Sequence, residues 1–206
     1  MFQIADLKAK KIKKIERGEK MAKKCCSTES GCSCGSQKVP VKKVVVEYLY
    51  LDLQTCDRCI GTDNVLDEVV AVLSPALKLA GYEIDYSKTE IESEELAEKY
   101  HFLSSPTIRV NGKDICQSVA ESSCGCCSEI SGTDVDCRVF EYDGNTYDIP
   151  PHEMLAEAIL KEVFAAPGAG YDTDCGCDCS CNEYTLPENL KTFFIGKNIK
   201  ERKEIE

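Results

Sequence analysis

The sequence predicts an α/β domain built on a mixed β-sheet flanked by helices. Three observations support this fold class. Residues 44–50 are apolar and β-branched without helical periodicity, which indicates a buried strand. Apolar residues then recur at helical spacing from Leu66 to Ala80, and a strand over residues 107–110 runs into Asn111-Gly112, a strong hairpin signal. A strand, a helix and an antiparallel hairpin in this order are typical of a layered α/β domain.

The first two elements set the frame of the domain. Residues 44–50 lack a polar face, so we expect this strand to be buried on both sides. Thr62, Asp63 or Asn64 offers an N-cap for the helix, which leaves a short loop after Cys59. We expect Pro75 to kink this helix or to restart it with Ser74 as cap.

Local signals also predict the later elements. Residues 82–86 alternate as a strand, and Ser93 opens a short helix. A second hairpin turns at Asp143-Gly144, and Pro150-Pro151 starts a helix with one apolar face. Between the two hairpins lies a Cys-, Ser- and Gly-rich insertion, residues 116–135, so the predicted domain comprises residues 44–165.

Two Cys-rich tails flank the predicted domain. Residues 1–43 form a basic and Cys-rich extension that we expect to be flexible, and Met21 offers an alternative start that would leave residues 1–20 untranslated. Residues 166–206 form a C-terminal tail whose first part is too polar and Gly-rich to pack. Its last stretch, with Leu190, Phe193 and Phe194, either caps the domain or serves as a peptide for a partner.

Charge and hydropathy exclude several classes of partner. The formal charge of −11 argues against nucleic acid as the main partner. Residues 1–24 are basic and form either a solvated extension or an amphipathic helix for a membrane surface or a partner. No apolar stretch approaches the roughly 20 residues that a transmembrane helix needs, and no secretory signal is recognisable. We therefore expect a cytoplasmic protein.

Cysteine is used far more than in ordinary proteins, with 15 residues in 206. Structural disulfides are rare in a reducing compartment, so metal ligation or transient redox chemistry is the expected use of these thiols. Most of them occur in tight groups: Cys25-Cys26, Cys32-x-Cys34, Cys56-x-x-Cys59, Cys124-x-Cys126-Cys127 and Cys175-x-Cys177-x-Cys179-x-Cys181.

The pair that follows the first strand is the candidate reactive dithiol. Cys56 is the expected nucleophile or first ligand, and Cys59 the resolving thiol or second ligand. Arg58 would favour the Cys56 thiolate, whereas Asp57 would oppose it. The alternative interpretation is a pair of reduced, buried structural cysteines.

The CxxC motif and the segment Ser105-Pro106-Thr107, which opens the strand before the first hairpin, resemble the thioredoxin-like superfamily. The resemblance implies a thioredoxin-like fold in which Pro106 is cis and lies against Cys56 and Cys59. The segments TCDRCIGTDNVL, SSPTIRVNGKDI and DVDCRVFEYDGNTYDIPP also resemble an uncharacterised branch of that superfamily, a domain of unknown function associated with arsenic and mercury resistance gene clusters. Asp57-Arg58 replaces the Gly-Pro of thioredoxin itself, which argues against a general disulfide reductase.

The remaining cysteines are candidate metal ligands. Cys124, Cys126 and Cys127, together with Cys116 or Cys137, supply three or four thiolates that suit zinc, Cu(I), Hg(II) or As(III). We interpret Cys25, Cys26, Cys32 and Cys34, with Cys175, Cys177, Cys179 and Cys181, as scavenging arms. The alternative is a flexible insertion loop whose cysteines oxidise adventitiously.

The expected function is that of a thioredoxin-fold dithiol protein that binds or relays soft metal or metalloid ions, with arsenite and mercuric ions as cargo and a metal efflux component as partner. One alternative is a thiol-disulfide oxidoreductase or metalloid reductase that uses Cys56 and Cys59 and receives electrons from a thioredoxin system. Another is a zinc-stabilised interaction module.

Overall fold

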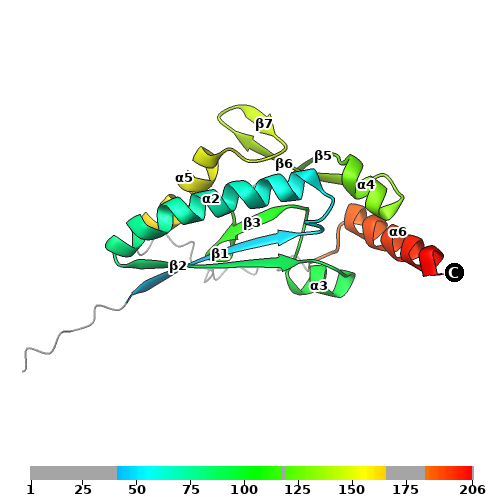
Figure 1. Cartoon of the computed structure of the whole chain (residues 1–206), viewed down its shortest axis with the longest axis horizontal. Helices are drawn as coiled ribbons and strands as arrows, with labels where there is room; N and C mark the ends of the chain where they lie inside the picture. Colours follow the sequence, from blue (N-terminus) through cyan, green and yellow to red (C-terminus); the bar gives the residue numbers. More distant parts are fainter. Residues whose placement is uncertain (1–40, 117–118, 166–183, 206) are drawn as a thin grey trace, which may run out of the picture. The chain divides into compact units, whose positions relative to one another are not determined.

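The computed structural model describes residues 41–116, 119–165 and 184–205 (Figure 1). Most of the predicted N-terminal extension and the cysteines from Cys175 to Cys181 lie outside these ranges. Within the described ranges, no helix is long and apolar enough to cross a membrane.

A four-stranded mixed sheet forms the centre of the domain. Its strands are β1 (Lys42–Tyr50), β2 (Tyr82–Glu90), β3 (Thr107–Val110) and β4 (Lys113–Asp114), in the order β2-β1-β3-β4. β1 pairs with β2 in parallel and with β3 antiparallel, and β3 pairs with β4 through the hairpin at Asn111-Gly112, where both residues have positive φ. The predicted fold class is confirmed, and the arrangement is compatible with a thioredoxin-like fold.

The predicted insertion and second hairpin form a separate three-stranded sheet. Its strands are β5 (Ala120–Ser123), β6 (Asp136–Tyr142) and β7 (Asn145–Tyr147), in that order. Two contacts of Arg138 join this sheet to the first. Its backbone N–H donates to the carbonyl of Ser105 at 2.7 Å, and its fully buried guanidinium binds both carboxylate oxygens of Asp114 at 2.7 and 2.8 Å.

Helix α2 (Asp57–Leu79) begins directly after Cys56, so the predicted loop before the helix is wrong. The N-cap predicted at residues 62–64 is also wrong, because a residue that precedes the helix, Asp52, organises the backbone where the helix begins. The Asp52 Oδ1 atom accepts the backbone N–H groups of Gln54, Thr55 and Cys56 at 2.6–3.1 Å. The helix also continues through Pro75 without a restart.

Helices α2 and α5 (His152–Phe164) pack against each other and against one face of the first sheet. Among the described elements, α3 (Glu94–Lys99) packs on the opposite face, near the end of β1. Burial along β1 therefore alternates in its first half, with Val44 and Val46 buried and Val45 37% exposed. The expectation of a strand buried on both sides is wrong for that half.

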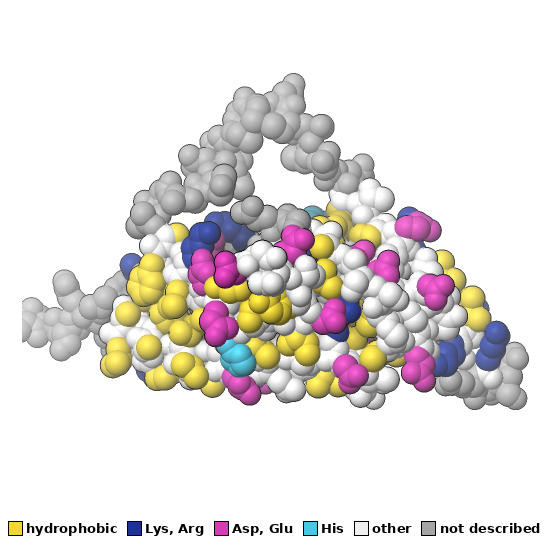
Figure 2. Space-filling model, turned by 90° about the horizontal axis from the view of Figure 1, so that it is seen from above, with side chains coloured by type: hydrophobic (Ala, Val, Ile, Leu, Met, Phe, Trp, Pro, Cys, Tyr) yellow, Lys and Arg dark blue, Asp and Glu magenta, His cyan; other side chains and the backbone are white. Residues whose placement is uncertain are grey.

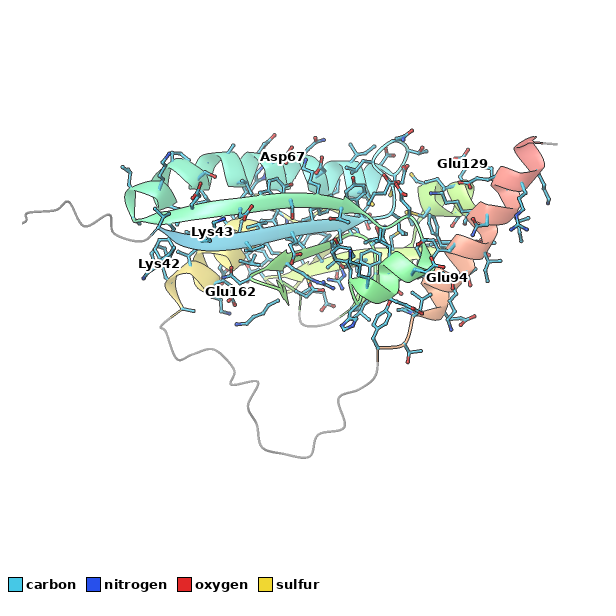
Figure 3. The ribbon with its side chains drawn as sticks, turned by 90° about the horizontal axis from the view of Figure 1, so that it is seen from below. Lys42, Lys43, Asp67, Glu94, Glu129 and Glu162 are labelled. Atoms are coloured by element: carbon cyan, nitrogen blue, oxygen red, sulfur yellow. The ribbon has the colours of Figure 1, made fainter. Side chains whose placement is uncertain are left out.

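Helices α4 (Gly125–Ser131) and α6 (Glu188–Ile205) pack together at the end of the sheet where α2 begins (Figure 1). Leu190, Phe193 and Phe194 are buried in this contact, which confirms that the last stretch caps the domain. Lys200 Nζ donates to the backbone carbonyl of Glu129, a residue of α4 labelled in Figure 3, at 2.8 Å.

On the face of the molecule shown in Figure 2, acidic and basic side chains alternate with apolar ones, and no continuous basic surface forms among the described residues there. Charged side chains also pair with one another across elements. For example, Lys88 lies 2.7 Å from Asp63 and 2.8 Å from Asp67, which joins β2 to α2.

Candidate functional site

The starts of two helices bring three cysteines together. Cys56 is the N-cap residue of α2, and Cys124 is the N-cap residue of α4. Their Sγ atoms lie 4.0 Å apart. Cys127, in the first turn of α4, places its Sγ atom 3.7 Å from that of Cys56. All three sulfurs lie within 4.8 Å of one another.

A fourth thiol comes from the second sheet. Cys137 on β6 places its Sγ atom 3.3 Å from that of Cys127. Cys56, Cys127 and Cys137 have no exposed surface, and Cys124 is 4% exposed. We call Cys56, Cys124, Cys127 and Cys137 the thiol cluster. A metal ion needs several His, Cys, Asp or Glu ligand atoms close together. In the described parts of the chain, one such group of three or more side chains occurs, and it consists of Cys56, Cys124 and Cys127.

Cys59 lies beside the thiol cluster and is also fully buried. Its Sγ atom is 3.4 Å from the Oγ atom of Ser105, and the peptide bond between Ser105 and Pro106 is cis, as the resemblance implied. The Ser105 hydroxyl also accepts the backbone N–H of Leu51 at 3.1 Å. Ser105 therefore links the cis-proline segment both to the CxxC motif and to the end of β1.

Hydrogen bonding divides the thiols into two that lose a proton readily and three that keep it. Hydrogen bonds from Cys124, and then from Cys127, Cys137 and Cys59, hold the pKa of the Cys56 thiol below its usual value, although burial opposes this. Hydrogen bonds with Cys127 and Cys137 lower the pKa of Cys124 to about 7. Cys56 therefore loses its proton first, with the neighbouring thiols as donors, and Cys124 is the next to ionise.

The other three thiols act as donors. The hydrogen bond to Cys56, followed by burial, raises the pKa of Cys59. Hydrogen bonds to Cys124 are the first cause of the raised pKa values of Cys127 and Cys137. A cluster of this kind holds thiolate and thiol side by side, because a buried thiolate needs donors around it and cannot tolerate several like charges in contact.

Arg58 has a different role from the one predicted. Its side chain is 9% exposed and turns toward the second sheet, where it donates to the carbonyls of Cys137 at 2.8 Å and Arg138 at 3.3 Å. It also binds Ser122 on β5 and pairs with Asp148 at 2.6 Å. Arg58 thus joins the start of α2 to the strand that carries Cys137. The main causes of the lowered pKa of Cys56 are its hydrogen bonds with other thiols, and Arg58 is not among them.

The remaining predicted ligands are spread over three places. Cys126 is partly exposed, and its Sγ atom lies 3.9 Å from the Asp57 carboxylate at the edge of the thiol cluster. Cys116 belongs to the other core, where burial raises its pKa to about 11. The cysteines of the two tails lie outside the described residues.

Sequence reasoning treated the CxxC motif and the insertion as separate groups. The contact between Cys56 and Cys124 spans 68 residues, and no local pattern indicates it. The roles of Ser105 and Arg58 were missed for the same reason.

The donor set suits an ion that prefers sulfur. Sulfurs that share a zinc ion at about 2.3 Å lie about 3.8 Å apart, close to the 4.0 and 3.7 Å that separate Cys124 and Cys127 from Cys56. Cys137 lies outside the group of three whose sulfurs are all within 4.8 Å of one another. A set of three sulfurs also fits ions of lower coordination number. Thiolates without imidazole or carboxylate select soft ions such as Cu(I), Hg(II) and As(III), besides zinc.

Comparison with known proteins gives one family and no named relative. No curated protein and no solved structure shows a significant match to the chain. Residues 44–159, which include α2 and all four cysteines of the thiol cluster, match a family described as a domain of unknown function. The chain therefore belongs to the family DUF2703.

Proposed function

We propose that the thiol cluster binds a soft metal or metalloid ion, with arsenite and mercuric ion as the cargo, on a thioredoxin-like framework. The observation that carries this proposal is the convergence of Cys56, Cys124 and Cys127, whose sulfurs lie within 4.8 Å of one another in the core. Cys137 stands beside them as a fourth donor. The lowered pKa values of Cys56 and Cys124 favour ligation, because a thiol must lose its proton to bind an ion.

The burial of the cluster favours ion binding over thiol-disulfide exchange with a protein. An exchange reaction requires access to the attacking sulfur, yet Cys56 and Cys59 are both 0% exposed. A small ion requires only a narrow opening. The placement of the CxxC motif between β1 and α2, beside the cis peptide bond at Pro106, supports the oxidoreductase as the second candidate.

The chemistry of arsenite capture is redox-neutral. Each sulfur that bonds to As(OH)₃ displaces one hydroxide, which leaves as water after taking the proton of that thiol, or a proton from solvent where the sulfur is already a thiolate. Capture by three thiols therefore releases three waters and yields a neutral tris-thiolate. A neutral product suits a buried site, since no uncompensated charge remains in the core.

The test is a titration of the reduced, full-length chain with arsenite and, separately, with Hg(II), under anaerobic conditions. Elemental analysis of the protein before titration reports any resident zinc. Free thiols are counted at each step, and sulfur-to-metal charge-transfer absorbance reports bond formation. A background variant with the eight tail cysteines changed to Ser isolates the core. In this background we expect one ion per chain and the protection of three or four thiols.

Matched variants assign the binding to the cluster. Cys127→Ser should abolish high-affinity binding, whereas Cys116→Ser, which removes a partly buried thiol of the other core, should not change it. If the background variant protects no thiols, the proposal fails. A fixed zinc content that arsenite does not displace would establish the interaction module instead. Turnover with a thioredoxin system through a Cys56 mixed disulfide would establish the oxidoreductase.

A further inference from the structure

The thiol cluster is almost fully buried among the described residues. Four of the five cysteines of the cluster and its neighbour Cys59 are fully buried, and Cys124 is 4% exposed. Cys126 is the exception among the cysteines that pack in this core, because it is partly exposed while it contacts the core formed by the cluster. It lies on the same turn of α4 as Cys127. Among the cysteines of the described core, Cys126 therefore offers the most accessible sulfur to an ion that approaches from solvent.

Cys126 also contacts the helix that begins directly after Cys56. Its Sγ atom lies 3.9 Å from the Asp57 carboxylate, and Asp57 is the exposed residue that follows Cys56 directly in α2. The contact joins the exposed ends of the two helices that supply Cys56 and Cys124. A carboxylate that accepts the S–H hydrogen keeps the thiol oriented until an incoming ion replaces the proton.

We propose that Cys126 is the outer thiol of the site, which takes the ion from a small thiol carrier and passes it to Cys56, Cys124 and Cys127. This inference rests on the proposed function and adds the source of the ion, a low-molecular-weight thiolate complex. Each transfer is a ligand exchange without change of oxidation state. The Cys126 sulfur bonds to the ion, its proton goes to the departing carrier thiolate, and the carrier leaves as a thiol. Cluster thiols then displace Cys126 in the same way.

Ligand exchange explains why an outer thiol is useful here. A carrier complex of three small thiols is too large to reach sulfurs that have no exposed surface, so direct loading requires α4 to move away from its packing on α6. An exposed sulfur at the edge allows the first bond to form without that movement. Cys126 should therefore affect the rate of loading and not the final affinity.

The experiment measures loading by stopped-flow absorbance, with arsenite presented as its tris-glutathione complex to the full-length chain whose eight tail cysteines are Ser. Cys126→Ser should slow loading about tenfold or more, which corresponds to about 1.4 kcal/mol of activation free energy, and should leave the equilibrium affinity within about threefold. Cys116→Ser, the control for loss of a partly exposed thiol, should load at the parental rate. Asp57→Asn should load more slowly than the parent and faster than Cys126→Ser.

The outcomes separate this inference from the one on which it rests. If Cys126→Ser loads arsenite at the parental rate and binds it with the parental affinity, the role of Cys126 as the outer thiol is refuted and the proposed function stands. A large loss of equilibrium affinity in Cys126→Ser would show that Cys126 is a permanent ligand, which would also refute the transfer of the ion from Cys126 to the cluster. If the parental chain binds no arsenite, the proposed function fails and this inference with it.

Discussion

Arg58 is the residue whose removal best tests how the site is held together. Its guanidinium makes one short hydrogen bond, 2.8 Å to the carbonyl of Cys137, and three longer contacts with Ser122 and Arg138. It also pairs with Asp148, whose side chain is 67% exposed. The change Arg58→Ala removes all of these at once and separates the start of α2 from the second sheet.

The expected loss follows from these contacts. A hydrogen bond from a charged donor contributes about 1.5–3 kcal/mol, and an ion pair with an exposed partner adds at most about 1 kcal/mol. Arg58→Ala should therefore lower the free energy of unfolding by about 2–4 kcal/mol. Because Cys56 and Cys137 lose their common support, arsenite affinity should also fall by about tenfold, or about 1.4 kcal/mol.

Denaturant unfolding of the reduced protein, with and without arsenite, measures both quantities. The matched control is Arg109→Ala, because the Arg109 Nη2 atom also donates to a backbone carbonyl, that of His101 at 3.1 Å, but away from the cluster. The control should lose less stability and no arsenite affinity. The reasoning is refuted if Arg58→Ala is no less stable than Arg109→Ala, or if it binds arsenite as tightly as the parent.

Two further predictions concern the helix that carries Cys124 and Cys127, and the charge of the cluster. A Cβ atom on Gly196 would lie 2.5 Å from the Ser131 carbonyl, so Gly196→Ala should push α6 from α4 and destabilise the fold in thermal unfolding, although Ala is the better helix former. Gly125→Ala, which meets open space, is the control, and equal stability in the two variants would contradict the close contact. Because the pKa of Cys124 is lowered to about 7, the reduced protein should lose one step of thiolate ultraviolet absorbance as the pH falls through about 7. The measurement uses the chain whose eight tail cysteines are Ser, and this step should vanish in Cys124→Ser. If Cys124→Ser instead removes a step near pH 8.5, the value of a free thiol, the hydrogen bonds do not act as described.

Local sequence patterns accounted for most of the elements of the fold. Ser93 caps α3 as predicted, with its Oγ atom accepting the N–H of Leu96, and both hairpins turn at the predicted Asn-Gly and Asp-Gly pairs. These features depend on neighbours a few residues apart, so the chain carries their signal locally. For Leu190, Phe193 and Phe194 the sequence left two outcomes open, packing on the domain or binding to a partner. An apolar stretch alone does not indicate which surface it will cover.

The start of α2 shows where local reasoning fails. Good N-cap residues occur at Thr62, Asp63 and Asn64, yet the helix begins at Asp57 because Asp52 binds the backbone of the preceding turn. A cap is a local preference of about 1 kcal/mol, and tertiary packing of Cys59 and Thr62 in the core overrides it.

The sequence by itself determined the α/β class, the order of the strands along the chain and the candidacy of Cys56, Cys59, Cys124, Cys127 and Cys137 as functional thiols. Only the tertiary structure decided that Cys56 lies with Cys124 and Cys127, that Cys116 does not, and that Arg58 joins the start of α2 to the second sheet. The physical reason is the range of the interactions. Turns, caps and periodicity depend on adjacent residues, whereas the cluster depends on a contact across 68 residues that forms when α4 packs against α6 and the start of α2.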